Sequence, residues 1–273
     1  MSKGKLLIGS PICQKPFILT AFLYSLRWLE LSDYEVYYHF IDDNYDQQSQ
    51  KILKNFQAEK EHVVIERLSM QPTEFSPSHN WNQEKIWKVA NYKDYLIQRA
   101  RQENFDYLFL VDSDLLLYPR TIKQLMAADK EIISEVFWTQ WSETAIAQPQ
   151  VWLLDFYTQY EKKMGEEITQ EEELSRTMEF YNKLRQPGVY EVGGLGACTL
   201  IAKSAIAKGI SFQPIKNLTF WGEDRHFCIR ACALEIELFV DTHYPAYHIF
   251  RDSEWAGGLQ FLNDHVFFPD QEP

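Results

Sequence analysis

The sequence predicts an α/β fold in which a mostly parallel, Rossmann-like sheet is flanked by helices. Short apolar segments alternate with longer segments of helical period, and this alternation implies parallel pairing of the strands. Acidic residues follow two of the expected strands, at Asp42-Asp43 and at Asp112-Ser113-Asp114. The carboxyl ends of parallel strands meet at one edge, where α/β sheets bind their ligands. Both acidic groups should therefore lie beside a ligand-binding crevice.

The first half of the chain contains four expected strands. The first is at residues 5–10, followed by a turn at Pro11 and a helix that begins near Pro16. Apolar residues at helical spacing indicate that helix, namely Phe17, Ala21, Phe22, Leu26 and Leu29. Further strands are expected at 36–41, 62–67 and 107–111, with helices at 47–58 and 83–102. Three strands thus precede the one that ends at Asp112.

The second half continues the alternation with one large departure. A short helix after Pro119 leads to a strand at 131–137, and strands are also expected at 197–202 and 236–240. Residues 160–186 are highly charged and should form an exposed helical excursion, because runs of glutamate favour solvent. Residues 252–273 are aromatic and irregular and should form a tail or a flap over the site.

Length and charge limit the class of protein. The 273 residues fit one large α/β domain. The formal charge of 27 − 39 = −12 disfavours nucleic acid as a partner, because a phosphate backbone needs a basic surface. The apolar run Leu6-Leu7-Ile8 is too short for a signal-peptide core, and no run approaches the ~18 apolar residues of a membrane span. We expect a cytoplasmic protein with no transmembrane segment.

Asp112 and Asp114 follow the apolar strand 107–111 directly. Carboxylates two residues apart lie on one side of an extended backbone, and two like charges are unfavourable there unless a cation lies between them. Carboxylate oxygens suit Mn²⁺ or Mg²⁺, which can also bind a diphosphate and stabilise its charge as it leaves. The alternative is a turn capped by two aspartates without a metal.

A histidine near the last expected strand is the third candidate ligand. His248 is preferred because it follows the strand at 236–240 by one loop, and His243 is the alternative. An ordinary core or surface histidine also stays open. An imidazole beside two carboxylates favours Mn²⁺ over Mg²⁺ modestly.

A pair of acids, Glu223 and Asp224, lies where a helix is expected to begin, beside Trp221 and Gly222. The helix dipole alone favours carboxylates at this position. The pair also suits acceptor binding and proton abstraction, since it lies in the same half of the chain as His248. We favour Asp224 over Glu223 as the general base.

Four segments together resemble the GT-A fold glycosyltransferases, most closely the family-2-like enzymes, with some likeness to the fungal mannosyltransferase group. Residues 91–93 and 105–114, closing with Pro119, are similar to the donor-site region of these enzymes. Residues 192–202 resemble their glycine-containing acceptor loop, 221–228 their Glu-Asp segment, and 240–249 their closing strand with its metal histidine. The resemblance covers about residues 5–250.

The resemblance implies a nucleotide-diphosphate sugar donor of the UDP or GDP type and an acceptor whose identity stays open. It implies a catalytic domain at 1–251, with a donor half at 1–118 and an acceptor half at 119–251. The implied metal ligands are Asp112, Asp114 and His248, and the implied base is Asp224, assisted by Glu223. Donor contacts are implied for Pro11, Asp42, Asp43, Asp112 and Ser113, and acceptor contacts for Gly193, Gly194, Trp221 and Gly222.

The sequence departs from the family pattern ahead of the strand at 107–111. The usual Arg-Asn pair is replaced by Ala90-Asn91, so the cation for the diphosphate is left among Lys85, Lys88 and Lys93. Likeness to family 2 favours inversion at the sugar carbon, although both stereochemical outcomes occur on this fold.

Two alternatives to a transferase stay open. Haloacid-dehalogenase-like phosphatases also carry Asp-x-Asp after a strand, but usually the first strand, and with Thr or Val where this chain has Leu116. A catalytically inactive nucleotide-sugar-binding module would use the same contacts without turnover. Loss of the acids at 223–224 would indicate such a module, and both acids are present.

Overall fold

The computed structural model describes residues 3–68, 82–154, 156–219 and 222–267. Within these ranges the strands are β1 (Gly4–Ile12), β2 (Tyr34–Asp42), β3 (Val63–Glu66), β4 (Tyr107–Leu110), β5 (Leu115–Leu116), β6 (Ile132–Thr139), β7 (Gln148–Pro149), β8 (Val151–Trp152), β9 (Val189–Val192), β10 (Gly194–Leu195), β11 (Thr199–Ala202) and β12 (Leu238–His248). The helices are α1 (Pro16–Arg27), α2 (Gln47–Glu59), α3 (Gln83–Gln102), α4 (Thr121–Ala127), α5 (Gln170–Leu184), α6 (Lys203–Lys208), α7 (Glu223–Ala233) and α8 (Trp255–Leu262), with a 3₁₀ turn η1 (Asp252–Glu254) and a π turn η2 (Asn263–Phe267).

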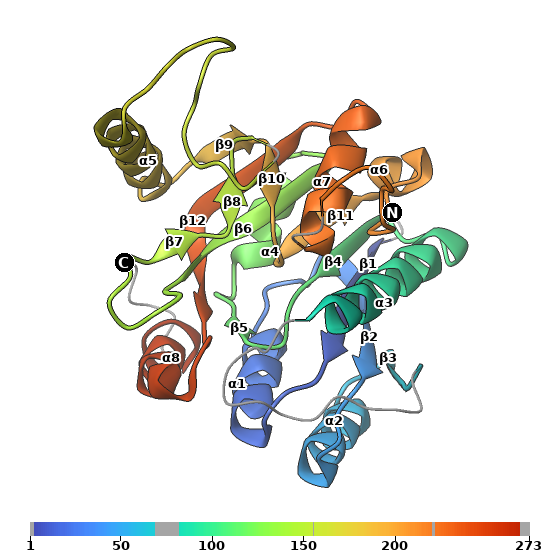
Figure 1. Cartoon of the computed structure of the whole chain (residues 1–273). Coiled ribbons are helices and arrows are strands. Elements are labelled where there is room, and N and C mark those ends of the chain that lie inside the picture. The colour runs from blue at the N-terminus through green and yellow to red at the C-terminus, as the bar shows by residue number, and fades with distance from the viewer. Residues whose placement is uncertain (1–2, 69–81, 155, 220–221, 268–273) are drawn as a thin grey trace.

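Most of the described strands form a large central sheet with the order β3-β2-β1-β4-β11-β6-β12-β5, to which β7 and β9 also pair, while β8 and β10 form a separate two-stranded sheet (Figure 1). β1 pairs in parallel with β2 and β4, β2 with β3, and β6 with β12. β11 runs antiparallel between β4 and β6. The predicted mostly parallel α/β sheet is thus confirmed. The strand expected at 197–202 runs antiparallel within it, as do the short strands β5, β7 and β9 at their pairings with β12 and β6.

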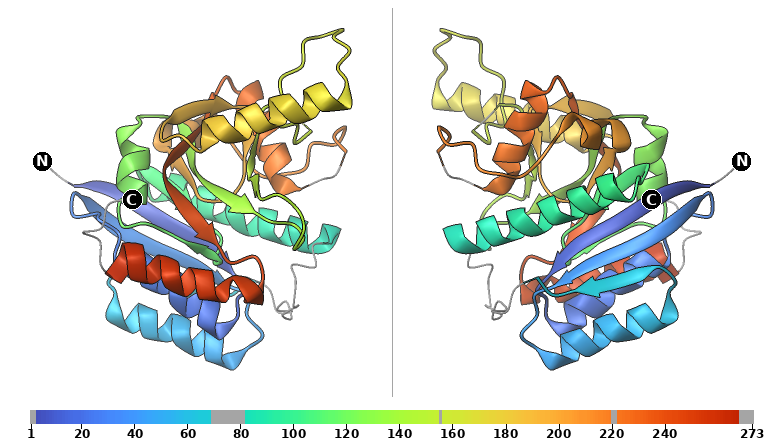
Figure 2. Two further views of the ribbon diagram at one scale, coloured as in Figure 1. Left: turned by 90° about the vertical axis from the view of Figure 1, so that its left-hand side faces the viewer. Right: turned by 90° about the vertical axis from the view of Figure 1, so that its right-hand side faces the viewer.

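Helices cover both faces of the sheet (Figure 2). α1, α2 and α4 pack on one face against side chains that include Leu6, Ile8 and Phe109. α3, α6 and α7 pack on the other face, against Leu7 and Leu108. Successive residues of a strand point to opposite faces, so a strand covered on both sides is apolar throughout. Full burial of each such side chain contributes about 1.5–3 kcal/mol.

Local signals fix where the helices of the first half begin. Pro16 is the first residue of α1, where its missing N–H leaves no bond unmade. Asp46 caps α2 by accepting a hydrogen bond from the backbone N of Ser49 at 2.7 Å. Asn82 caps α3 in the same way at Lys85 N, at 2.9 Å. Each cap satisfies a donor that the first turn would otherwise leave unpaired.

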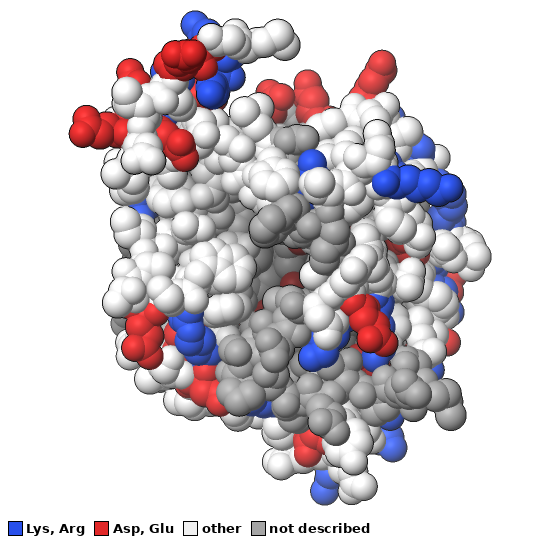
Figure 3. All heavy atoms as spheres, viewed as in Figure 1, with Lys and Arg blue, Asp and Glu red and all other residues white. Residues whose placement is uncertain are grey.

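The charged segment at 160–186 contains one helix, α5, which begins later than the segment itself. Thr169 and Glu172 form a capping box at its start. Most of the helix is exposed, and mixed basic and acidic side chains project at the upper left of Figure 3, on the side where Figure 1 labels α5. The buried positions lie in its second half, at Phe180, Tyr181 and Leu184.

The last strand is longer than the sequence predicted. β12 continues to His248, with an irregularity in its pairing with β6 between Asp241 and Ala246. Pro245 lies in this irregular stretch, where a strand tolerates a residue without an N–H. The prediction that His248 follows the strand by a loop is therefore wrong. His248 is the last residue of β12 and pairs with Leu115 of β5.

The C-terminal segment is also more regular than predicted. Residues 252–267 form η1, α8 and η2, and α8 packs against α1 through a cluster that includes Phe261, Leu262, Ile18 and Ala21. The prediction of an irregular segment is wrong for these residues, because their apolar side chains find a partner face on α1. Residues 268–273 of the predicted tail lie outside the described residues. Across the described ranges, no helix has the length and apolar character needed to cross a membrane.

Candidate active site

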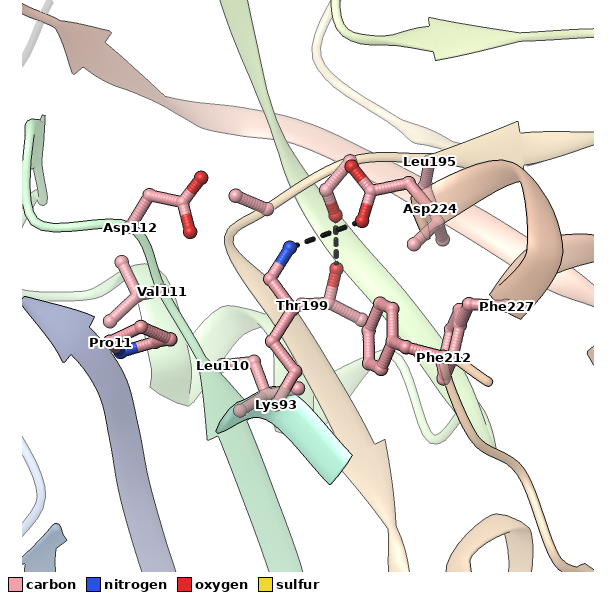
Figure 4. A pocket seen from close by; sticks show the side chains of 12 residues that line it. Pro11, Lys93, Leu110, Val111, Asp112, Leu195, Thr199, Phe212, Asp224 and Phe227 are labelled. Carbon is pink, nitrogen blue, oxygen red and sulfur yellow. Dashed lines mark hydrogen bonds and ion pairs between the residues drawn. The ribbon is translucent and has the colours of Figure 1, made fainter. Parts of the chain in front are cut away.

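A pocket lies at the carboxyl ends of β1 and β4, beside the first turn of α7 (Figure 4). Its lining residues come from both halves of the chain: Pro11, Lys93, Leu110, Val111, Asp112, Leu195, Gly196, Ala197, Thr199, Phe212, Asp224 and Phe227. The face shown in Figure 3 is hollowed near its centre, and acidic side chains are visible inside the hollow. The pocket thus lies at the sheet edge where the sequence predicted a ligand site.

The two aspartates after β4 belong to this edge. Asp112 lines the pocket, and Asp114 is 6% exposed. A hydrogen bond from Leu115 N to Asp112 O, at 3.2 Å, closes the turn between them. Burial raises the pKa of Asp112; Lys93 lowers it, whereas Asp114 and Glu223 raise it further. Holding these carboxylates together therefore costs electrostatic free energy, which a cation would relieve.

His248 lies beside Asp114. Its Nε2 is 3.7 Å from Asp114 Oδ2, and its Nδ1 is 2.9 Å from Oγ1 of Thr139 at the end of β6. A partner on one imidazole nitrogen orients the other, as it does for histidines that bind metals. His243 has different partners, with its Nδ1 3.0 Å from Asp241 Oδ1. The structure thus brings His248, the preferred histidine, to the aspartate pair.

The acid pair at the start of α7 faces Lys93 of α3. Lys93 Nζ is 2.8 Å from Glu223 Oε1 and 3.2 Å from Asp224 Oδ1. Burial opposes the charge of Lys93, but the neighbouring carboxylates outweigh burial and hold its pKa well above the ordinary value. Those carboxylates belong to Asp224, Glu223 and Asp112.

The pKa of Asp224 suits a general base. Burial raises this pKa to about 7, with Lys93 lowering it and with Glu223 and Asp112 raising it. The single ammonium of Lys93 does not fully offset the effects of burial and of the neighbouring carboxylates, so the pKa of Asp224 stays raised. A group that exchanges a proton at the working pH is the most effective acid or base catalyst.

Asp42 and Asp43 lie at the end of β2, at the same edge of the sheet, and both are buried. Arg67 NH2 is 2.9 Å from Asp42 Oδ2, and Lys88 Nζ is 2.7 Å from Asp43 Oδ1. The hydroxyl of Tyr92 donates to Asp43 Oδ1 at 3.2 Å. These contacts fix two carboxylates beside the strand end of β1 that carries Pro11.

The other residues predicted to bind the donor, three lysines and Ser113, lie at different places in the structure. Of the three lysines considered for a diphosphate, Lys88 contacts Asp43 and Lys93 contacts the acid pair of α7. Lys85 is half-buried in the first turn of α3. Ser113 is 6% exposed, between the two aspartates. Lys88 and Lys93 therefore do not converge on one point.

The predicted acceptor glycines have a packing role. A Cβ on Gly193 would lie 2.0 Å from the carbonyl oxygen of Leu153, and one on Gly194 would lie 2.0 Å from the ring of Trp152. The pocket itself is lined by the residues that follow, 195–197. Gly222 precedes α7 with φ of 133°, a conformation that favours glycine. Trp221 lies outside the described residues.

Replacing Gly193 by alanine should destabilise the protein by about 1–3 kcal/mol, because the new methyl group would overlap backbone atoms. Gly196→Ala is the matched control, since its Cβ would lie 3.4 Å from the nearest atom, the carbonyl oxygen of Gln150. Urea unfolding of both variants measures the difference. Equal unfolding midpoints would show that the glycine at 193 is not required by packing.

The sequence did not single out two polar residues of this edge. Arg67, which contacts Asp42, ends the segment predicted as the third strand, and Thr139, which contacts His248, ends β6. The available signal was their position, because polar residues at the carboxyl ends of parallel strands reach the ligand site.

The described residues contain no group of three His, Cys, Asp or Glu side chains arranged to hold a metal ion. Asp112, Asp114 and His248 gather at one edge without closing a three-ligand site. Their donor atoms nevertheless suit Mn²⁺ or Mg²⁺, since such ions are commonly held by one or two carboxylates together with substrate phosphates.

No protein-family model and no curated protein matches the sequence. Solved structures do match. S. aureus TarS 1-349 is 14% identical with a TM-score of 0.52, and the match covers 98% of this chain and 67% of that one. The same protein in complex with UDP is 13% identical with a TM-score of 0.55 and the same coverage. TarS is a family-2-like GT-A glycosyltransferase.

The chain has the GT-A fold. At this level of identity the likeness shows the GT-A fold alone. The chain spans 58% of TarS 1-349 in complex with UDP-GlcNAc, at a TM-score of 0.52 and 14% identity over 89% of its own length. It spans 41% of the longer TarS chain, with a TM-score of 0.53 and 13% identity over 99% of its own length. The position of Asp112 after β4 also disfavours the phosphatase alternative, because those phosphatases usually carry Asp-x-Asp after the first strand.

Proposed function

We propose that this chain is a metal-dependent glycosyltransferase that moves a sugar from a nucleotide-diphosphate sugar to an acceptor hydroxyl. One juxtaposition carries the proposal: Asp112, after β4, and Asp224, at the start of α7, line the same pocket of a GT-A fold. S. aureus TarS, which shares the fold, has been crystallised with UDP and with UDP-GlcNAc. These complexes support a UDP-type donor, with a GDP-type donor as the alternative.

The nucleoside is assigned to the edge formed by Pro11, Asp42 and Asp43. Fixed carboxylates at this edge accept hydrogen bonds from base or ribose, and their ion pairs with Arg67 and Lys88 hold them in place. The diphosphate would then extend from the nucleoside toward Asp112, because the pocket runs from β1 to β4.

A divalent cation is assigned to Asp112, Asp114 and His248. The charge balance supports a cation, because three carboxylates (Asp112, Glu223 and Asp224) gather around the ammonium of Lys93, and Asp114 adds a further negative charge beside Asp112. When bound with the donor phosphates, Mn²⁺ or Mg²⁺ supplies Lewis-acid stabilisation of the charge that develops on the departing diphosphate.

Asp224 is assigned as the general base. As the acceptor oxygen bonds to the anomeric carbon, the bond from that carbon to the diphosphate oxygen breaks, and the carboxylate of Asp224 takes the hydroxyl proton. Attack from the face opposite the leaving group inverts the anomeric centre. Glu223 lies next to Asp224 in the first turn of α7 and is paired with Lys93 of α3, and it orients the acceptor or that first turn.

A thermal-shift screen tests the proposed function. UDP-, GDP- and dTDP-sugars are added with and without Mn²⁺, and the melting temperature is recorded. A rise with one donor that needs Mn²⁺ is the expected result, since a ligand that binds the folded state stabilises it. If no nucleotide-sugar raises the melting temperature under either condition, the proposed function is wrong.

The two histidines of β12 should differ in their effect on metal binding. His248→Ala should weaken Mn²⁺ affinity by about 10–100-fold, because the imidazole beside Asp114 is lost. His243→Ala is the matched control, since His243 contacts Asp241, and it should leave Mn²⁺ affinity unchanged. Titration of each variant with Mn²⁺ and nucleoside diphosphate measures both affinities. Reversed effects would move the ligand to His243.

A further inference from the structure

Lys93 is a buried cation that joins the two halves of the proposed site. It belongs to the middle of α3, and its side chain is 4% exposed. Figure 4 shows its nitrogen between the carboxylates of Asp112 and Asp224, and a dashed line joins it to Asp224. The ammonium also lies 5.0 Å from the ring centroid of Phe212.

The contacts of Lys93 favour one position of the acid pair. The ammonium is 2.8 Å from Glu223 Oε1 and 3.2 Å from Asp224 Oδ1, so it binds one oxygen of each carboxylate. The Asp224 side chain stays 27% exposed and lines the pocket, so part of it remains available to an acceptor. Charge-assisted hydrogen bonds in a buried setting are strong and directional.

We propose that Lys93 is a positioning residue for the catalytic base: its ammonium, reaching from α3, holds the Asp224 carboxylate and the first turn of α7 in the orientation that proton abstraction needs. This inference rests on the proposed function. It replaces the expectation that Lys93 serves the diphosphate, since that role would direct the ammonium to the donor rather than to α7.

The two roles for Lys93 predict different kinetics. Loss of a positioning residue lowers kcat and leaves the donor KM nearly unchanged, because donor binding does not involve Asp224. Loss of a diphosphate cation raises the donor KM. A misplacement of about 1 Å in a reacting group can cost ~10²-fold in rate, so Lys93→Met should lower kcat by roughly 10–100-fold.

The test compares three variants. Lys93→Met removes the charge and keeps a straight side chain, and Lys93→Arg keeps the charge and should recover at least part of the lost kcat. Lys88→Met is the matched contrast, because Lys88 contacts Asp43 and its loss should raise the donor KM instead. A Lys93→Met enzyme with wild-type kcat, or with unchanged kcat and a raised donor KM, would overturn the inference.

Stability is measured in the same experiment. The thermal shift caused by Mn²⁺ and nucleoside diphosphate should persist in Lys93→Met. Such a shift would show that the donor site is intact. If Lys93→Met does not fold, the double variant Lys93→Met/Glu223→Gln is used, because it removes both charges of the Lys93–Glu223 ion pair. Its kcat should be about tenfold or more below that of Glu223→Gln alone. Equal rates for those two would overturn the inference. A wild-type enzyme that releases no nucleoside diphosphate from any donor would instead contradict the proposed function.

Discussion

Asp224→Asn should lower the rate of sugar transfer by ~10²–10⁴-fold, the usual contribution of a general base. The amide keeps the shape of the side chain but cannot remove the proton from the acceptor hydroxyl. Donor and metal binding should persist, because Asp224 lies on the acceptor side of the pocket, at the start of α7. Initial rates with saturating donor, and the thermal shift with Mn²⁺ and nucleoside diphosphate, measure the two properties separately.

The pH profile gives the same prediction an independent check. A base must be ionised, and burial raises the pKa of Asp224 to about 7. The wild-type rate should therefore rise as the pH increases through about 7, and this rise should be absent from Asp224→Asn. Near-normal turnover in Asp224→Asn would rule out the role and direct attention to Glu223. A product with retained anomeric configuration would contradict the single-base mechanism even if Asp224 were essential.

Asp114→Asn should abolish the stabilisation that Mn²⁺ and nucleoside diphosphate give to the wild-type protein. A ligand at roughly a hundredfold over its Kd stabilises the folded state by about 2.7 kcal/mol. The loss is expected because Asp114 is 6% exposed beside His248, and an amide there provides one weaker ligand oxygen without charge. Melting temperatures with and without the ligands measure the difference.

A matched control separates the loss of a metal-binding carboxylate from the loss of any negative charge. Asp252 is an aspartate paired with Lys15, and its side chain is 56% exposed. Asp252→Asn should therefore retain the full shift produced by Mn²⁺ and nucleoside diphosphate. The same shift in wild type, Asp114→Asn and Asp252→Asn would remove Asp114 from the metal site.

Much of the fold could be predicted because the relevant signals are local. The strands and helices of the first half follow from apolar runs and from apolar residues at helical spacing. The errors lie where tertiary contacts decide. The sequence around Pro245 suggested a loop, but pairing with β6 and β5 extends β12 to His248. α8 is stabilised by α1, more than 200 residues away in sequence, which no local pattern reveals.

The sequence allowed candidate residues of the site to be proposed, but it did not indicate the contacts among them. Asp112, Asp224 and His248 could be proposed because strand ends and helix starts meet at one edge of an α/β sheet. The pairing of Lys93 with Glu223 spans 130 residues of sequence, so only the folded chain brings it about. The glycines at 193 and 194 looked like acceptor contacts, whereas their close approach to residues 152–153 gives them a packing reason.

The most direct test of the central claim measures release of nucleoside diphosphate from a donor sugar. The wild-type protein is incubated with each UDP- and GDP-sugar, with Mn²⁺ or with a chelator, and without an acceptor, because an active transferase slowly passes sugar to water. We expect release from at least one donor, dependent on Mn²⁺ and strongly reduced in Asp224→Asn. A donor that binds with a clear thermal shift but releases no nucleoside diphosphate would instead identify an inactive nucleotide-sugar-binding module.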